Sequence, residues 1–501
     1  MIYKRETLIA IIVVAMLAIG CKSTETSNGI SKIKSSSEKP NILFLLTDDQ
    51  SFNTIRALGN KEVSTPNMDK LVAKGTTFTH AHIMGGNTGA ICMPSRAMIM
   101  TGKYVQNLAK VPGAIGKNDK TMPEVLKNAG YTTFETGKWH NERPAFAKSF
   151  TNGANIFLGG MSNHLKVPLH DFDPSGNYPK SKKRYEDKFS SVLFREAAVA
   201  FLENYKEDKP FFVYVAFSSP HDPRMAPKEY QDKYNTEAIS LPKNFQPIHP
   251  FDNGELIIRD ENLLPFPRTK KAVKGEIASY YAMISEVDDN IGKILAALEK
   301  SGKAENTIII FAGDNGLAAG QHGLLGKQSI YDHSIRVPLV ISGPGIQKGV
   351  RTESLVYLND LFPTIADIVG TEKPATIDGT SLLPILENPK KTVRESVFFL
   401  YKNFQRGVRT KNWKLIKYLV EGKQTTQLFE IKKDPLEMNN LANNPDYKEK
   451  VVEMTQLLQE WIDKSGDKVQ LNQSDWGVKV IKSWATVRKE RGLSLDFKGG
   501  H

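Results

Sequence analysis

Five short runs of apolar, mostly β-branched and aromatic residues constrain the fold of this chain more than any other feature. The runs are nearly continuous rather than alternating, as expected of strands that are buried on both faces of a parallel sheet. Helical patterns lie between them, and strands that alternate with helices indicate an α/β sandwich. The runs are NILFLL (41–46), YTTFET (131–136), FFVYVAF (211–217), TIIIFA (307–312) and PLVIS (338–342), and the clearest helical patterns cover 65–75, 191–207 and 277–302.

A different pattern begins after about residue 385. The segments SVFFLYK, RGVRTKNWKLIKYL and TTQLFEI predict a small antiparallel sheet, and residues 447–464 predict a helix that follows it. Because 501 residues exceed what one ordinary core holds, we place a second domain here. The Pro-rich segment 224–275 has little periodicity, and such a long stretch inside a compact domain favours a functional loop.

The chain begins with a segment typical of exported proteins. It has a short basic start, an apolar run from Leu8 to Ile19 that is too short for a comfortable membrane span, and then Cys21. The residues that end at Cys21 resemble a bacterial lipobox, in which the cysteine is lipidated; the alternative is an ordinary cleaved signal. We expect a lipoprotein signal peptide over 1–21 and a polar, Ser-rich tether over 22–39. The protein would then be lipid-anchored in the cell envelope, at the periplasmic or surface face of the outer membrane, or periplasmic if it is not lipidated.

Charge and cysteine content narrow the chemistry. The formal net charge of +12 favours polyanionic partners, and export argues against nucleic acid. With Cys21 assigned to the lipobox, Cys92 has no partner for an intramolecular disulfide. Cys92 therefore either only packs in the core or has a chemical role.

Four of the five runs are followed at once by polar residues. Ligands of open α/β sheets bind beyond the carboxyl ends of the strands, so we expect these side chains to converge on one crevice. The four polar clusters are Thr47-Asp48-Asp49, Gly137-Lys138-Trp139-His140, Ser218-Ser219-Pro220-His221 and Gly313-Asp314-Asn315-Gly316.

The residue types in these clusters indicate two kinds of chemistry. Three aspartates and one asparagine supply only oxygen ligands, which suits a hard cation such as Ca²⁺ or Mg²⁺. Lysines and histidines add positive charge and proton-transfer groups, which suits the binding and cleavage of an anionic ester. The candidate ligands are Asp48, Asp49, Asp314 and Asn315, and the candidate cations and proton-transfer groups are Lys138, Lys327, His140 and His221.

The stretch CMPSR (92–96) supplies a reactive side chain. Pro94 fits the first turn of a helix, which places Cys92 just before the helix N-terminus, where an anion is favoured, and Arg96 about one turn further on. A thiolate is a soft ligand, and hard cations that are held by oxygen atoms bind soft ligands weakly. This mismatch indicates that the residue beside the metal is no longer a thiol.

The same stretch, with Thr101-Gly102-Lys103 after it, resembles the Cys-x-Pro-Ser-Arg signature of type I sulfatases. In that family the cysteine is oxidised after translation to formylglycine. The resemblance covers nearly the whole mature chain, and it implies an alkaline-phosphatase-like fold with a large, mixed, mostly parallel sheet sandwiched by helices. It also implies a catalytic domain over 40–384 and a C-terminal subdomain over 385–501. The further matching segments are PNILFLLTDDQ, TPNMDKLVAKGTTFTHAH, TGKWH, SSPHDP, FAGDNGLAAGQHGLLGKQSIYDHSIRVPLVISGPG and LFEIKKDPLEMNNLA.

The resemblance also implies a role for each polar residue. The metal, Ca²⁺ with Mg²⁺ as the alternative, would be held by the oxygen ligands together with formylglycine at position 92. The formylglycine hydrate would attack sulfur while the alcohol leaves, and the resulting sulfate adduct would then collapse to release sulfate. The implied roles are metal ligand for Asp48, Asp49, Asp314 and Asn315, hydrate contact for Arg96, sulfate binding for Lys138 and Lys327, base for His140, and acid for His221.

The resemblance implies a sulfated glycan as substrate and a separate enzyme that makes formylglycine, either a formylglycine-generating or an anaerobic sulfatase-maturating enzyme. Segment 241–269 resembles sulfatases that act on glycans, with an algal glycan such as ulvan first and glycosaminoglycan second. The candidate substrate contacts are Asp222, Arg224 and His322. We expect contact with a membrane only through the N-terminal lipid, and no nucleic acid partner.

Two other functions compete with this reading of the sequence. The first is a phosphonate or phosphodiester hydrolase of the same superfamily, although its two-zinc members have Asp-His where this chain has Asp314-Asn315. The second is a sulfated-glycan-binding lipoprotein that has lost catalysis, although the complete set of polar residues argues against it.

Overall fold

The computed structural model describes most of the predicted mature chain. The predicted signal peptide with Cys21, the tether except Lys39, and part of the end of the predicted C-terminal subdomain lie outside the described residues. Among the described residues, no helix combines the length and apolar character that a membrane span requires. The described residues are 39–108, 113–477, 486 and 489–490.

The strands of the described chain form two sheets, and the larger has eight strands in the order β5-β4-β6-β1-β7-β8-β2-β9. Seven of these strands share one direction, and β8 pairs antiparallel with both of its neighbours. The sheet is therefore mixed and mostly parallel, and the inclusion of PLVIS among parallel strands was wrong. The bounds are β1 Asn41–Thr47, β2 Gly75–His82, β4 Thr132–Lys138, β5 Asn152–Phe157, β6 Phe211–Ala216, β7 Thr307–Gly313, β8 Leu339–Ser342 and β9 Val350–Tyr357.

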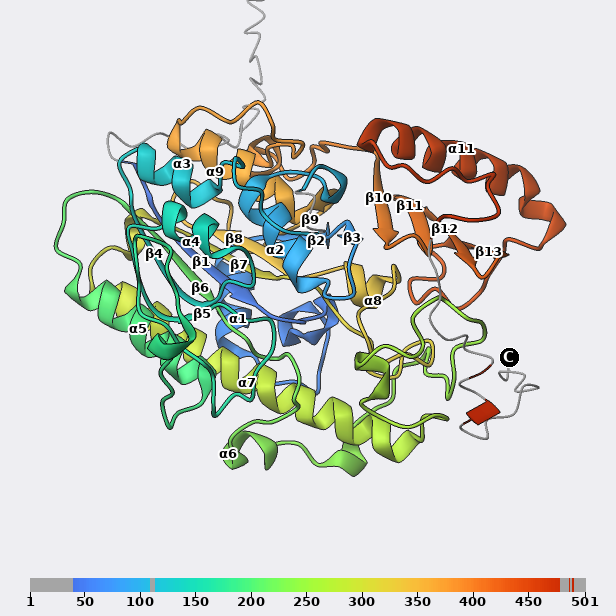
Figure 1. Cartoon of the computed structure of the whole chain (residues 1–501), viewed down its shortest axis with the longest axis horizontal. Coiled ribbons are helices and arrows are strands. Elements are labelled where there is room, and N and C mark those ends of the chain that lie inside the picture. Colours follow the sequence, from blue (N-terminus) through green and yellow to red (C-terminus); the bar gives the residue numbers. More distant parts are fainter. Residues whose placement is uncertain (1–38, 109–112, 478–485, 487–488, 491–501) are drawn as a thin grey trace, which may run out of the picture.

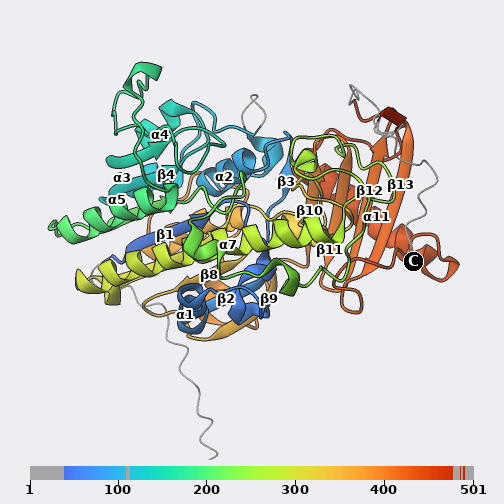
Figure 2. The ribbon, with the colours of Figure 1, turned by 90° about the horizontal axis from the view of Figure 1, so that it is seen from below.

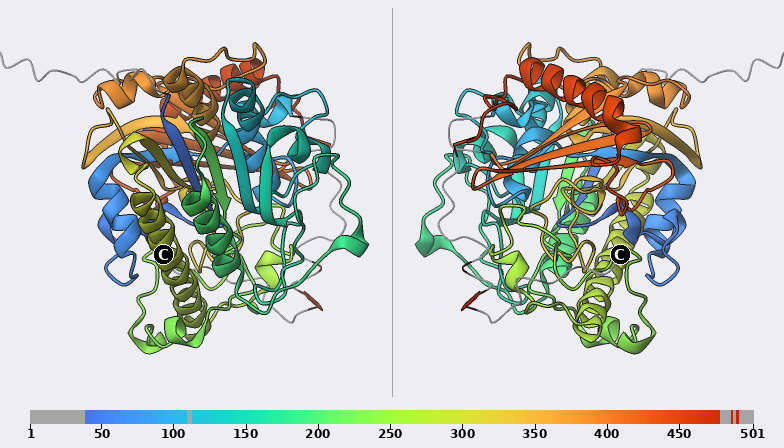
Figure 3. Two further views of the ribbon diagram at one scale, coloured as in Figure 1. Left: turned by 90° about the vertical axis from the view of Figure 1, so that its left-hand side faces the viewer. Right: turned by 90° about the vertical axis from the view of Figure 1, so that its right-hand side faces the viewer.

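Helices cover both faces of this sheet (Figures 1 and 3). Successive side chains of a strand point to opposite faces, so the continuous apolar sequence of β1 supplies both cores. Ile42 and Phe44 belong to the core on one face, and Leu43 and Leu45 belong to the core on the other. The first core includes residues of α2 (Cys92–Thr101), α3 (Met122–Asn128), α4 (Arg143–Ser149) and α9 (Leu361–Val369), and the second includes residues of α1 (Pro66–Lys74), α5 (Ser190–Asn204) and α7 (Lys270–Lys300).

The second sheet lies at one end of the molecule, beyond the end of the long helix α7 (Figure 2). Its strand order is β13-β12-β11-β10-β3, and its strands from β10 to β13 are antiparallel, as the sequence predicts. Helix α11 packs against β11 and β12. The bounds are β3 Gly85–Gly86, β10 Ser396–Tyr401, β11 Gln405–Thr410, β12 Trp413–Val420, β13 Lys423–Glu430 and α11 Lys448–Ser465, and the short helices are α6 Lys228–Gln231, α8 Asp332–Ile335 and α10 Leu383–Glu387.

Strand β3 joins the two parts of the fold. It comes from the segment just before α2, and it pairs in parallel with β10 of the C-terminal sheet. Gly85 has a φ of +96°, and a Cβ atom at this position would overlap the carbonyl oxygen of Leu400. The close backbone approach therefore requires glycine. As a result, the segment that leads to Cys92 is fixed by residues that are more than 300 positions later in the chain.

Candidate active site

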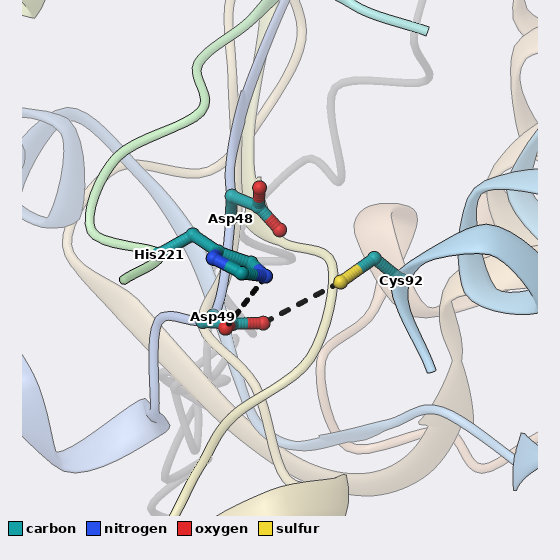
Figure 4. A group of neighbouring side chains, drawn as sticks. All are labelled: Asp48, Asp49, Cys92 and His221. Atoms are coloured by element: carbon teal, nitrogen blue, oxygen red, sulfur yellow. Dashed lines mark hydrogen bonds and ion pairs between the residues drawn. The ribbon is translucent and has the colours of Figure 1, made fainter. Parts of the chain in front are cut away.

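The carboxyl ends of four strands of the large sheet bring the predicted polar residues together. Asp48 and Asp49 follow from β1, Lys138 ends β4, His221 lies in the loop after β6, and Asp314 and Asn315 follow β7. Helix α2 adds Cys92 at its first residue, whereas the sequence placed it just before the helix. Figure 4 shows Asp48, Asp49, Cys92 and His221 around one point.

Asp49 lies at the centre of the site. Its Oδ1 and Oδ2 atoms accept hydrogen bonds of 2.7 and 2.9 Å from Lys327 Nζ, and Asn315 Nδ2 donates to Oδ1 at 2.7 Å. Cys92 Sγ lies 3.6 Å from Asp49 Oδ1 and 2.9 Å from Lys327 Nζ. Although burial opposes it, the positive charge of Lys327 holds the pKa of Asp49 well below its usual range, so this carboxylate stays ionised.

A second group of buried charges lies next to Asp49 and consists of Asp48, Arg96, Lys138 and Asp314. Lys138 Nζ donates to Asp48 Oδ2 at 2.5 Å, and Arg96 Nε donates to Asp314 Oδ2 at 2.8 Å. Arg96 Nη2 lies 3.8 Å from Asp48 Oδ1. All four side chains are at most 1% exposed, so each charge depends on its partner in a low dielectric.

Two buried oxygen atoms in this group have no hydrogen-bond partner: Asp48 Oδ1 and Asn315 Oδ1. Buried polar atoms are almost always paired, so unpaired ones indicate a missing ligand. One ligand atom each from Asp48, Asp49, Cys92 and His221 also lie within 4.8 Å of one another. Asp48 and Asp49 offer carboxylate oxygens to this cluster, Cys92 offers sulfur and His221 offers nitrogen, whereas Asp314 is not part of it. The carboxylate oxygens, together with the unpartnered Asn315 Oδ1, fit Ca²⁺ or Mg²⁺.

Cys92 is not in the state of a reactive thiolate. The side chain is 1% exposed, and burial raises the pKa of the Cys92 thiol well above its ordinary value. A protonated thiol is a weak nucleophile. As a thiol, Cys92 would therefore be a weak nucleophile, and the change of this residue to formylglycine stays a prediction.

The two histidines differ in their hydrogen bonds. His221 Nδ1 lies 2.7 Å from the carbonyl oxygen of Asp222, and its Nε2 points toward Asp49 Oδ2 at 3.6 Å. His140 Nδ1 is buried without a partner, and a Cβ atom on Gly160 would overlap the His140 ring. Burial lowers the pKa of both histidines well below the ordinary value, so both are neutral here.

Four residues of the site form the floor of a pocket of about 310 Å³: Cys92, His140, His221 and Lys327. Its wall includes residues from two loops: Gly160 and Met161 from the loop after β5, and Ile258, Arg259 and Asp260 from the long segment between β6 and α7. The sequence predicted that segment 224–275 is a functional loop, but it identified neither Arg259 nor Asp260. The residues that line the pocket are Gly89, Ala90, Cys92, His140, Gly160, Met161, His221, Ile258, Arg259, Asp260, Lys327 and Gln328.

None of the three candidate substrate contacts, Asp222, Arg224 and His322, lines this pocket. Asp222 lies behind the wall and pairs with Arg259. Arg224 points away, because its Nε donates to Glu276 Oε1 at 2.6 Å and its guanidinium lies over Tyr280.

His322 also lies away from the pocket. Its ring stacks on Tyr331 with a centroid distance of 4.0 Å, and its Nε2 lies 3.1 Å from Asn244 Nδ2. In this structure His322, like Arg224, is committed to contacts within the protein.

Comparison with known proteins adds an independent line of evidence. The family model described as Sulfatase matches residues 40–371, and the model described as N-sulphoglucosamine sulphohydrolase, C-terminal, matches residues 320–464. An N-acetylglucosamine-6-O-sulfatase of Bacteroides thetaiotaomicron is 29% identical over 85% of this chain and 87% of its own length. An ulvan-active sulfatase of Formosa agariphila is 28% identical over 86% of this chain and 82% of its own length. A solved structure described as a complex with its substrate D-glucosamine-2-N,6-O-disulfate has a TM-score of 0.73 and 26% identity, and it covers 86% of this chain and 99% of that chain.

Proposed function

Because this chain belongs to the sulfatase family, which makes it a sulfuric ester hydrolase that acts on glycans, we propose that it works with formylglycine in place of Cys92 and one divalent cation. The observation that carries this proposal is the position of Lys327. Its Nζ lies 2.9 Å from Cys92 Sγ and 2.7 Å from Asp49 Oδ1. A sulfate group next to position 92 would therefore meet a buried ammonium group.

Formylglycine would supply a hydrated aldehyde as nucleophile and a route for sulfate to leave, which a thiol does not offer. A divalent cation held by Asp48, Asp49, Asp314 and Asn315 would supply positive charge against the charge that develops on the sulfate oxygens. Ca²⁺ is the first candidate and Mg²⁺ the second, because all four side chains offer oxygen.

The protein's own side chains would divide the remaining work. Lys138 and Lys327 bind the sulfate oxygens, and Arg96 holds the group at position 92 through its place beside Asp48 and Asp314. His140 is neutral and has an unpartnered Nδ1, so it can accept a proton. His221 is the acid for the leaving alcohol, and the negative charge of a bound sulfate ester favours the protonated form that this role requires.

The relatives support two substrate classes. One is a 6-sulfated glucosamine unit, as in a glycosaminoglycan, because the Bacteroides relative is named an N-acetylglucosamine-6-O-sulfatase and the solved structure holds D-glucosamine-2-N,6-O-disulfate. The other is ulvan, the class that the sequence ranked first and that is named for the Formosa relative. A pocket of about 310 Å³ is at the small end for ligand sites, which favours one terminal sugar unit and exo action.

The proposed setting of the enzyme is the cell envelope. An exported protein that is lipidated at Cys21 would meet large glycans or their fragments at the outer membrane or in the periplasm. A formylglycine-generating or anaerobic sulfatase-maturating enzyme would convert Cys92 before export.

The test is free sulfate released from glucosamine 6-sulfate oligosaccharides, ulvan, carrageenan, fucoidan and chondroitin fragments. The protein is co-expressed with a formylglycine-generating enzyme, mass spectrometry verifies position 92, and Cys92→Ala is the control. Release from one glycan that is lost in Cys92→Ala supports the proposal. If the verified protein releases no sulfate from any member of the panel, a sulfated glycan is the wrong substrate class, and phosphonates and phosphodiesters are assayed next.

A further inference from the structure

Arg259 closes a ring of polar contacts around the mouth of the pocket. On one side its guanidinium forms a bidentate pair with Asp222, whose Oδ1 lies 3.3 Å from His221 Nδ1. On the other side Arg259 Nη2 donates to Asp260 Oδ1 at 2.5 Å. The other oxygen of Asp260 accepts a 2.6 Å hydrogen bond from Gln328 Nε2, next to Lys327 in the chain. The ring thus links the proposed acid to the proposed sulfate-binding lysine.

Arg259 has little capacity left for an anionic ligand. Its Nη1 atom donates to Asp222 Oδ2 and lies 2.8 Å from Met161 Sδ, and its Nη2 atom donates to Asp222 Oδ1 and to Asp260 Oδ1. These four contacts account for the four N–H bonds of the two terminal nitrogens. The guanidinium therefore serves to hold two carboxylates rather than to capture a second sulfate.

The carboxylate of Asp260 keeps acceptor capacity. Each of its oxygens accepts one hydrogen bond, from Arg259 or from Gln328, and an ionised carboxylate offers about four acceptor sites. Asp260 lines the pocket although its side chain is 6% exposed, whereas Asp222 lies behind the wall. Asp260 is therefore the carboxylate that a bound sugar can reach.

The rim that these residues form has a net negative charge. One guanidinium faces two carboxylates, and the nearby ammonium of Lys402 is already paired with Glu255. A second sulfate on the same sugar would meet this negative rim, while a hydroxyl or amine would find an acceptor.

On this basis, and resting on the proposed function, we infer that Asp260 is a specificity-determining residue. It accepts a hydrogen bond from a hydroxyl or N–H group of the sugar that carries the sulfate, and Arg259 holds it in place. The preferred unit has one sulfate, and the positions next to that sulfate are neutral or basic.

The experiment compares two substrates: the oligosaccharide that the panel above identifies, and the same oligosaccharide with a second sulfate on the same sugar. The wild type should prefer the monosulfated form in kcat/KM by about tenfold or more. In Asp260→Asn, kcat/KM for the monosulfated form should fall by about tenfold or more, and the preference should fall to within about threefold of unity. Arg259→Leu removes the group that holds Asp260 in place, so it should also lower kcat/KM for the monosulfated form and reduce the preference.

Two controls separate substrate recognition from structural damage. Asp171→Asn removes another aspartate that pairs with an arginine, but on an exposed surface outside the pocket wall, and it should leave both substrates unaffected. Inhibition by inorganic sulfate reports only how tightly sulfate binds at the floor of the pocket. Its inhibition constant should change by less than about twofold in Asp260→Asn.

Three results would overturn the inference: a wild type that favours the disulfated form, an unchanged preference in both variants, or a sulfate inhibition constant that rises as much as kcat/KM falls. The last result would mean that Asp260 acts only through Gln328 and Lys327. Failure of the proposed function looks different, because the wild type with verified formylglycine would then release no sulfate from any glycan.

Discussion

Replacement of Lys327 by methionine, which is one heavy atom shorter than lysine and uncharged, tests the central ion pair of the site with little change in side-chain shape. Lys327 and Asp49 have side chains that are 4% and 3% exposed, and the lysine makes both of its carboxylate contacts to Asp49. Lys327→Met therefore leaves a buried carboxylate without its nearest cation. Loss of one partner of a buried pair costs about 3–5 kcal/mol of unfolding free energy.

A divalent cation should reduce this loss, because it would sit against the same carboxylate and replace the missing charge. We expect the melting temperature of Lys327→Met to fall by about 3–5 °C in EDTA, since each kcal/mol moves it by about 1 °C in a chain of this size. In excess Ca²⁺ the fall should be about half as large or less, as the cation compensates Asp49. In excess Ca²⁺ sulfate release should fall by about a hundredfold or more, because the sulfate loses a charged donor.

The matched control is Lys300→Met, which removes a lysine–carboxylate ion pair at the surface. Lys300 lies 2.9 Å from Glu203, but the two side chains are 76% and 40% exposed, so the change in unfolding free energy should be below about 1 kcal/mol. Differential scanning calorimetry of both variants in EDTA and in Ca²⁺ makes the comparison. If Lys327→Met has the same melting temperature as the wild type in EDTA, the Asp49–Lys327 pair is not a buried charge pair and the description of the site is wrong.

Three further predictions concern the pocket, the cation and acid stability. Gly160→Ala should lower kcat by about tenfold or more, because its Cβ would displace the His140 ring, while Gly275→Ala on the open surface of α7 should keep full activity. Asn315→Ala should weaken Ca²⁺ binding by about tenfold in isothermal titration calorimetry, since it removes an unpartnered buried oxygen; unchanged affinity would exclude this oxygen as a ligand. Burial lowers the pKa of His333 from 6.5 to about 3, so its contribution to stability is complete above pH 6.5 and is lost as the pH falls toward 3. At pH 5 the loss is about 2 kcal/mol, and His333→Asn should therefore lose less stability than the wild type between pH 7.5 and 5 in denaturant titrations.

The five strands of the large sheet that the sequence predicted share one property, burial on both faces. The predicted runs became β1, β4, β6, β7 and β8, because a continuous apolar run needs no knowledge of its neighbours. The strands that were missed, β2, β5 and β9, mix threonine, histidine, asparagine and charged residues with apolar ones, and pairing with their neighbours holds them in the sheet. The antiparallel direction of β8 depends on chain connections and could not be predicted from five residues.

The floor of the site was more predictable than its wall. Asp48 and Asp314 directly follow a strand, Lys138 ends one, and His221 lies in the loop after another, so strand prediction alone placed them at one edge of the sheet. Arg259 lies in a segment without regular periodicity, and its place opposite Lys327 is a result of tertiary packing. Similarly, the departure of Arg224 from the pocket is set by Glu276 on α7, which is far away in the sequence.

The pairing of β3 with β10 limits the time during synthesis in which Cys92 is accessible to another enzyme. In the folded chain Cys92 is 1% exposed, so another enzyme can reach it only while this part of the chain is still open. The backbone before α2 gains its parallel partner only when Ser396–Tyr401 has been made, roughly 300 residues later, which takes about 15–60 s at ordinary rates of synthesis. Any enzymatic conversion of Cys92 therefore has to occur before the C-terminal sheet forms and β3 pairs with β10. If activity requires formylglycine, as proposed above, faster synthesis or a scarce modifying enzyme would leave more of the folded protein with an unmodified Cys92.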